Sequence, residues 1–155
     1  MTVIIVSGTP ATGKTTIAKL ISEKLGFTYI DGKKVIEKHG LSEGFDKKRD
    51  CVIVDVEKFL SAIKSEISGD IVVDSHLAHE LKAELVVITT CDRKVLKSRM
   101  EARGYSEAKI QENIEAEIFD VCFVEAQEAG QNVLKIDTTD SNSKKIIEKI
   151  KEKLN

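Results

Sequence analysis

The chain has 155 residues, of which 41% are hydrophobic and 32% charged, so it is long enough to bury the core of one domain without disulfides or a structural metal. Its net charge of −2 excludes an overall cationic field for nucleic acid or an anionic membrane, so any nucleic-acid contact must be local. Three widely spaced cysteines indicate free thiols in a reducing compartment, and no apolar run reaches the roughly 18 residues of a membrane span, so we expect a cytoplasmic protein with no membrane partner.

The first predicted element is an apolar strand at residues 3–6, and a phosphate-binding loop follows it directly. The sequence Gly8-Thr-Pro-Ala-Thr-Gly-Lys-Thr15 fits the pattern G-x-x-x-x-G-K-[ST] without a mismatch. Gly8 and Gly13 allow the backbone to wrap a triphosphate, Lys14 would reach the β- and γ-phosphates, and the Thr15 hydroxyl would hold Mg²⁺. The alternative is a glycine-rich turn that matches by accident. It is disfavoured by the strand before the loop and by the apolar stripe of a helix after it, at Ile17, Leu20, Ile21 and Leu25.

The rest of the chain alternates strands with helices. We expect a strand at 27–30, a polar helical insert from 33 to about 50, and a helix at 56–67 that ends at Gly69. The remaining elements are predicted as strands at 71–74, 84–89 and 132–136, and helices at 93–103, at 106–129 and near the end of the chain. This order predicts a single α/β domain over 1–155 with the P-loop NTPase fold, in which helices flank a parallel sheet of about five strands.

Polar residues directly after a buried strand are candidates for the site, because ligands of open α/β sheets lie at the carboxyl ends of the strands. Asp74 ends such a strand and would order Mg²⁺ beside Thr15. His76 could orient or deprotonate an attacking water or hydroxyl. The alternative makes Asp74 the N-cap of a short helix and His76 a hydrogen-bonded polar neighbour. His39 and His79 are expected at the surface.

A second group of candidates is basic. Arg99 and Arg103 lie four residues apart on one predicted helix and could both lean over a transferring phosphoryl group. The alternative is a solvated basic face balanced by Glu101 and Glu107. Gly104 favours a hinged lid that closes over the phosphates and excludes water.

Together these motifs resemble the adenylate kinase isoenzyme 6 or CINAP-type nucleotide kinases, whose archaeal members are described as adenylate kinases and ribosome-assembly ATPases. The resemblance covers most of the chain. The segments that carry it are 8–16, 44–51, 72–76, 101–105, 113–114 and 117–119.

The resemblance implies that Ala11, Gly13, Lys14, Thr15 and Thr16 bind ATP. Residues 31–54 would form the insert that binds a nucleoside monophosphate (NMP), and residues 102–112 a short lid with Arg103 on the ATP phosphates. Asp74 and His76 take the positions of the family's Walker B pair, and residues 137–140 would contact adenine.

The implied activity is Mg²⁺-dependent phosphoryl transfer from ATP to AMP or another NMP, by a protein expected to be a monomer. An ATPase role in late maturation of small-subunit rRNA is also implied. That role involves the pre-ribosomal small subunit and a transient complex with small-subunit ribosomal protein S-eleven.

Two residues depart from the family pattern. Leu77 stands where relatives often have glycine after the Walker B histidine, and Arg49 is the only arginine of the insert, where adenylate kinases use arginine to hold the AMP phosphate. Lysines 33, 34 and 38 could substitute only as point charges, so we expect weak or unselective NMP binding.

Two other functions remain open at this point. One is an assembly factor whose partner binding is switched by ATP, with NMP turnover incidental. The other is a kinase for a small metabolite such as shikimate or a sugar acid, which would need its own anion clamp.

Overall fold

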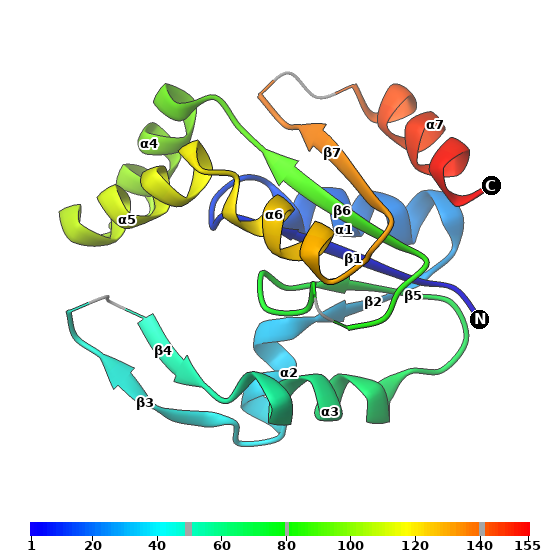
Figure 1. The fold of residues 1–155 in the computed structure, drawn as a ribbon, viewed down its shortest axis with the longest axis horizontal. Coiled ribbons are helices and arrows are strands. Elements are labelled where there is room, and N and C mark those ends of the chain that lie inside the picture. The colour runs from blue at the N-terminus through cyan, green and yellow to red at the C-terminus, as the bar shows by residue number, and fades with distance from the viewer. Residues whose placement is uncertain (49–50, 80, 140–141) are drawn as a thin grey trace.

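The structure, a computed structural model, describes residues 1–48, 51–79, 81–139 and 142–155 (Figure 1). A five-stranded sheet of order β2-β5-β1-β6-β7 lies at its centre, and every neighbouring pair in it is parallel. Both the α/β class and the expected number of parallel strands are therefore confirmed. The strands of this sheet are β1 (Val3–Gly8), β2 (Thr28–Asp31), β5 (Ile71–Asp74), β6 (Leu85–Thr90) and β7 (Val133–Asp137).

Helices cover both faces of the sheet, as Figure 1 shows. The described helices are α1 (Lys14–Leu25), α2 (Gly32–Lys38), α3 (Val56–Glu66), α4 (Arg93–Ala102), α5 (Glu107–Ile118), α6 (Val121–Glu128) and α7 (Ser143–Leu154). Because side chains alternate along a strand, Ile4 and Val6 of β1 pack with α1 and α7, whereas Val3 and Ile5 pack with α3 and α6. The sheet is thus buried on both sides, which explains its continuous runs of branched apolar residues.

A third, smaller core lies away from the sheet. It joins Leu96 and Met100 of α4 to Ile110 of α5, and it also includes Ala11 of the phosphate-binding loop. The helices that follow β6 are therefore packed directly against that loop.

The insert between β2 and α3 differs from the expected helical segment. Only its first part is helical, as α2, and it continues as an antiparallel hairpin of β3 (Ser42–Asp46) and β4 (Cys51–Val54). The hairpin is separate from the main sheet and leaves the large side chains of Phe45, Val52 and Ile53 exposed. Because apolar and polar residues do not alternate regularly there, the usual period-two signal is weak. Arg49 of the insert lies outside the described residues, as does Asp50 within the segment 44–51 that carries the resemblance.

The prediction of a single helix at 106–129 is also wrong, because this segment forms two helices. α5 ends at Ile118, and α6 begins after Asp120, whose φ of 55° lies in the left-handed region. Aspartate adopts this conformation more readily than most residues other than glycine, and its carboxylate binds the Lys135 ammonium group. One polar residue thus turns the chain between two helical segments.

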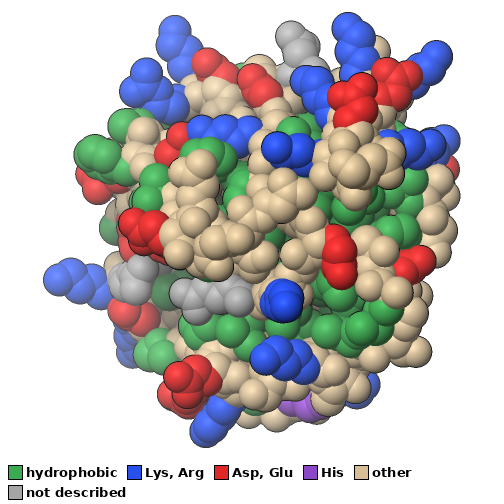
Figure 2. Space-filling model, turned by 45° about the vertical axis from the view of Figure 1, so that its right-hand side comes forward, with side chains coloured by type: hydrophobic (Ala, Val, Ile, Leu, Met, Phe, Trp, Pro, Cys, Tyr) green, Lys and Arg blue, Asp and Glu red, His purple; other side chains and the backbone are tan. Residues whose placement is uncertain are grey.

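The surface carries charges of both signs. On the face shown in Figure 2, Lys and Arg side chains are interspersed with Asp and Glu side chains. Within the described parts of the chain, no helix is both long enough and apolar enough to cross a membrane.

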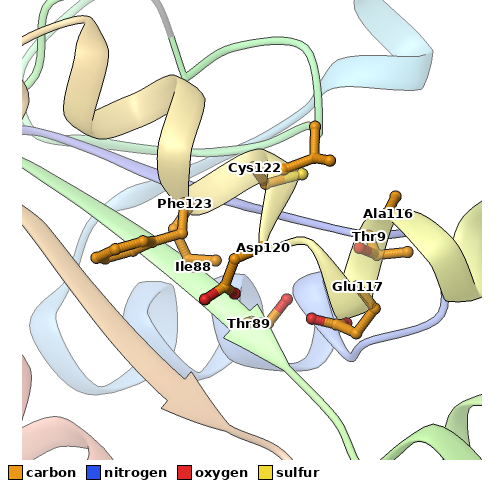
Figure 3. A pocket seen from close by; sticks show the side chains of 9 residues that line it. Thr9, Ile88, Thr89, Ala116, Glu117, Asp120, Cys122 and Phe123 are labelled. Carbon is orange, nitrogen blue, oxygen red and sulfur yellow. The ribbon is translucent and has the colours of Figure 1, made fainter.

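Under the corner between α5 and α6, the Glu117 carboxyl group points toward a small pocket that Thr9, Thr89 and Cys122 also line (Figure 3). Its Oε2 atom is buried and has no hydrogen-bond partner among the described residues. Burial first, and then the negative charge of Asp120, raise the pKa of Glu117 to about 7. Below about pH 7 the protonated form of this carboxyl group is therefore favoured in the folded protein.

The raised pKa gives a testable pH dependence. A carboxyl group whose pKa is higher in the folded than in the unfolded chain stabilises the fold below the unfolded pKa, and this contribution is lost as pH rises through about 7. Glu117→Gln cannot ionise, so its stability relative to the parent should be greater at pH 8 than at pH 4.5, as measured by urea unfolding. Glu115→Gln, an exposed position on the same helix, is the control. If the difference in unfolding free energy between Glu117→Gln and the parent is the same at both pH values, the raised pKa of Glu117 is contradicted.

Candidate active site

The phosphate-binding loop runs from the end of β1 to the start of α1 and has an unusual backbone. Gly8, Ala11 and Gly13 have φ angles of 144°, 71° and 95°, all positive. A Cβ atom at residue 8 would lie 2.6 Å from the Thr89 carbonyl oxygen, so only glycine fits there. Because α1 begins at Lys14, its positive end and its free N–H groups border the loop.

Neighbouring side chains hold this backbone in place. The Thr12 hydroxyl donates to the Thr9 carbonyl oxygen at 2.6 Å and lies 2.7 Å from the Thr89 hydroxyl. The Thr138 hydroxyl, just after β7, donates to the Thr12 carbonyl oxygen. Arg99 donates to the carbonyl oxygens of Ala11, at 3.2 Å, and Thr138, at 3.3 Å. Arg99, which was expected over the phosphoryl group, is thus engaged in holding the loop.

Thr15 and Asp74 meet although 59 residues separate them. The Thr15 hydroxyl donates to Asp74 Oδ2 at 2.6 Å, and the Tyr29 hydroxyl donates to the same oxygen at 2.9 Å. Accordingly, burial and then the hydrogen bond to Asp74 raise the pKa of Tyr29 above its usual range. Asp74 is only 7% exposed, so these donors fix the orientation of its carboxylate.

This pair of oxygen ligands fits Mg²⁺. A hydroxyl and a carboxylate are hard oxygen donors, and Mg²⁺ typically uses one or two of them together with phosphate oxygens and waters. The described residues contain no group of three or more His, Cys, Asp or Glu side chains that could hold a metal without such help. Thr15 and Asp74 would therefore share the ion with a nucleotide.

Basic side chains near Asp74 affect the pKa values of Lys14 and His76. Burial lowers the pKa of Lys14 to about 8, although the nearby Asp74 carboxylate acts in the opposite direction. Loss of hydration, followed by the charges of Lys14 and Lys33, lowers the pKa of His76 to about 4. The neutral imidazole is therefore favoured at pH 7. Lys109 of α5 adds to the same effect.

A cavity of about 310 Å³ opens beside the loop. It is large enough for part of a nucleotide, since small-molecule sites begin near about 300 Å³. Three backbone elements meet at it: the loop with the start of α1, the end of α4, and the segment after β7. Its lining residues are Ala11, Gly13, Thr16, Ile17, Arg99, Arg103 and Thr138.

The structure brings most of the predicted site residues together. Ala11, Gly13, Thr16 and Arg103 line the cavity, whereas the other predicted residues, Lys14, Thr15, Asp74 and His76, lie at the carboxyl end of β5 and the start of α1. Arg103 is exposed there, and its Nη1 atom donates to the Tyr105 hydroxyl at 3.4 Å. Of the predicted adenine segment, Thr138 lines the cavity, and Asp140 lies outside the described residues.

One expectation is wrong. His79 was predicted at the surface, but it is only 6% exposed, because its ring is enclosed between β1 and α6. His39 is exposed, as expected, and lies 3.3 Å from the Glu66 carboxylate.

The sequence reading also missed the supporting residues Tyr29 and Thr89. Thr89 lies near the carboxyl end of β6, beside the loop, which is a signal that the sequence offers. Tyr29 is the second residue of β2 and reaches Asp74 only through its long side chain, so its strand position gives no such signal.

Comparisons with known proteins identify the family of this chain. A family model described as an AAA domain matches residues 4–120. The chain is 40% identical to the "Putative adenylate kinase" of Thermococcus onnurineus (strain NA1) over 149 residues, which are 96% of this chain and 81% of that protein. It is 39% identical to the "Adenylate kinase isoenzyme 6 homolog" of Caenorhabditis elegans over 132 residues, 81% of this chain and 72% of that protein.

Solved structures with the same fold are more distant in sequence. A shikimate kinase from Acinetobacter baumannii superposes with a TM-score of 0.69 at 18% identity, covering 98% of this chain and 92% of that one. A gluconokinase from Sinorhizobium meliloti 1021 gives 0.59 at 20% identity, covering 99% and 91%. At such identity these two kinases show the fold alone. The relatives named before them show more: this chain belongs to the P-loop family of the archaeal adenylate kinases and the adenylate kinase isoenzyme 6 homologues.

Proposed function

We propose that this protein is a nucleoside monophosphate kinase, which transfers the γ-phosphoryl group of ATP to AMP or a related monophosphate. The observation that carries the proposal is the contact between the Thr15 hydroxyl and the Asp74 carboxylate at the edge of a complete phosphate-binding loop. Membership in the adenylate kinase family supports the choice of a nucleotide as acceptor.

Catalysis of this kind consists mainly of positioning and charge stabilisation. In our proposal Lys14 binds the β- and γ-phosphates, and Arg103 binds the phosphates from the opposite side of the cavity. Thr15 and Asp74 hold Mg²⁺, which would neutralise charge on the phosphates. His76 orients the attacking hydroxyl or phosphate oxygen, since its ring lies within electrostatic reach of Lys14.

The acceptor would lie between the insert, residues 31–54, and the lid, residues 102–112. Lys33 follows Asp31 at the start of the insert, and its charge reaches both Lys14 and His76. A lysine attracts a phosphate as a point charge but lacks the planar fork of arginine. We therefore expect this acceptor site to select weakly among monophosphates.

A second candidate function is an ATPase that acts in the cytoplasm on the pre-ribosomal small subunit, with small-subunit ribosomal protein S-eleven as its partner. The observation that favours a protein partner is the hairpin of the insert, where Phe45, Val52 and Ile53 are exposed. Here the same loop, Lys14 and Asp74 would drive hydrolysis, and NMP turnover would be incidental.

The first experiment follows the labelled γ-phosphate of ATP with and without AMP. We expect label in ADP made from AMP, and a loss of roughly 100- to 1000-fold in Lys14→Ala, because the variant lacks a charge that stabilises the transferring phosphoryl group. Lys24→Ala, an exposed position on the same helix, is the control. Label appearing only in free phosphate would instead support the ATPase, and the absence of both products would contradict both functions.

Arg103 should contribute to ATP binding from the lid side. Removing its charged hydrogen bonds in Arg103→Ala should raise the Kd for ATP by roughly 10- to 100-fold. Equilibrium dialysis or calorimetry measures this change directly. Arg93→Ala serves as the matched control, since Arg93 is exposed at the other end of α4. An equal effect of the two substitutions would argue against a specific contact.

Asp74 should determine the requirement for metal. In Asp74→Asn the Mg²⁺ concentration for half-maximal activity should rise by roughly 10- to 100-fold, because a neutral amide binds a hard cation less tightly than a carboxylate. A Mg²⁺ titration at saturating ATP gives this value. Asp70→Asn, an exposed position just before the same strand, controls for lost charge. An unchanged Mg²⁺ midpoint in Asp74→Asn would remove Asp74 from the metal site.

A further inference from the structure

One histidine that the proposed mechanism does not use is enclosed in the core. His79 lies in the segment between β5 and β6. Its Nε2 atom lies 2.5 Å from Oε2 of Glu125 on α6, and its Nδ1 atom lies 3.5 Å from the hydroxyl oxygen of Ser7 on β1. The ring therefore connects this segment to two elements that are distant from it along the chain.

The partners of His79 define the direction of these contacts. An ionised Glu125 carboxylate only accepts hydrogen bonds, so Nε2 carries the hydrogen and donates it. In the neutral ring Nδ1 is then an acceptor, and the Ser7 hydroxyl donates to it. This order resembles the arrangement of a nucleophilic serine, but Ser7 is completely buried and no substrate can reach it. The contacts can therefore orient the chain but cannot perform chemistry on a ligand.

The backbone of the same segment is fixed at both ends. At its start the Ser75 amide donates to the Val6 carbonyl oxygen at 3.1 Å. Further along, the Gln131 side chain donates to the carbonyl oxygens of His79, at 3.0 Å, and Leu81, at 2.6 Å. Figure 1 shows this segment beside α6. His76 thus lies between two attached points, residues 75 and 79.

We infer that His79 is a positioning residue for the phosphoryl-transfer site, which holds the His76 segment against β1 and α6 and so fixes His76 two residues beyond Asp74, at the carboxyl end of β5. The inference rests on the proposed function, because His79 acts there through His76. A displacement of about 1 Å at a reacting group can cost roughly 100-fold in rate, so such a support has a measurable effect.

The test compares two substitutions of His79. His79→Phe keeps an aromatic ring at this position but loses both hydrogen bonds, whereas His79→Gln retains an amide donor for Glu125. We expect His79→Phe to lower kcat for γ-phosphoryl transfer by roughly 10- to 100-fold, with the KM for ATP changed less than about twofold. His79→Gln should recover most of kcat. Equal activity of the two variants, or a KM effect alone, would overturn the inference.

A double variant separates positioning from general destabilisation. If His79 acts through His76, then His76→Ala with His79→Phe should be no slower than His76→Ala alone. Losses that multiply would show that His79 supports the fold or another group instead. Glu125→Gln is a second probe that the fold tolerates more readily, since the Glu125 side chain is 48% exposed, and Glu128→Gln on the same helix is its control.

Amide hydrogen exchange distinguishes failure of this inference from failure of the proposed function. His79→Phe and Glu125→Gln should speed exchange in peptides covering residues 75–79, while exchange in β1 stays at the parental rate. If His76→Ala retains full kcat, the proposed role of His76 is wrong, and the exchange result then decides only whether His79 holds this segment. Parental exchange at 75–79 in both variants would overturn it.

Discussion

The open backbone of the phosphate-binding loop is the constraint on which the site depends. Positive φ angles at Gly8, Ala11 and Gly13 give the loop a backbone shape of the kind that can surround an anion with N–H groups. The left-handed conformation at Ala11 costs about 1–2 kcal/mol, so the surrounding structure must hold it. Two side chains from outside the loop supply this support. Arg99 donates a hydrogen bond to the Ala11 carbonyl oxygen, and the Thr138 hydroxyl donates one to the Thr12 carbonyl oxygen.

The strand order then determines what faces the loop. β5 lies directly beside β1 and runs parallel to it, so Asp74 and the loop emerge at the same edge. The next strand, β2, places the Tyr29 hydroxyl on Asp74. On the other side of β1, β6 and β7 supply Thr89 and the segment with Thr138. Asp74 and Thr138, which lines the cavity beside the loop, therefore lie on opposite sides of β1.

Features that depend on residues close together in the sequence could be predicted, whereas features that depend on contacts between distant residues could not. The loop, the five parallel strands and the placement of Asp74 follow from local patterns, because a buried parallel strand and a loop motif are each continuous in sequence. The enclosure of His79 was not predictable, since it depends on Glu125, 46 residues later and on a different element. The break at Asp120 was missed because the apolar stripe of α5 continues into α6, whereas the turn depends on one backbone angle.

The shared core of Ala11, Leu96, Met100 and Ile110 packs α4 and α5 directly against the phosphate-binding loop. Because Ile110 of α5 and Ala11 belong to the same core, a rotation of α5 must be accommodated at Ala11, the strained residue of the loop. We therefore expect a shift of α5 to disturb the backbone at Ala11, and a change at Ala11 to disturb the packing of α4 and α5. A larger side chain at position 11 would therefore have to be accommodated by α4 and α5 as well as by the loop.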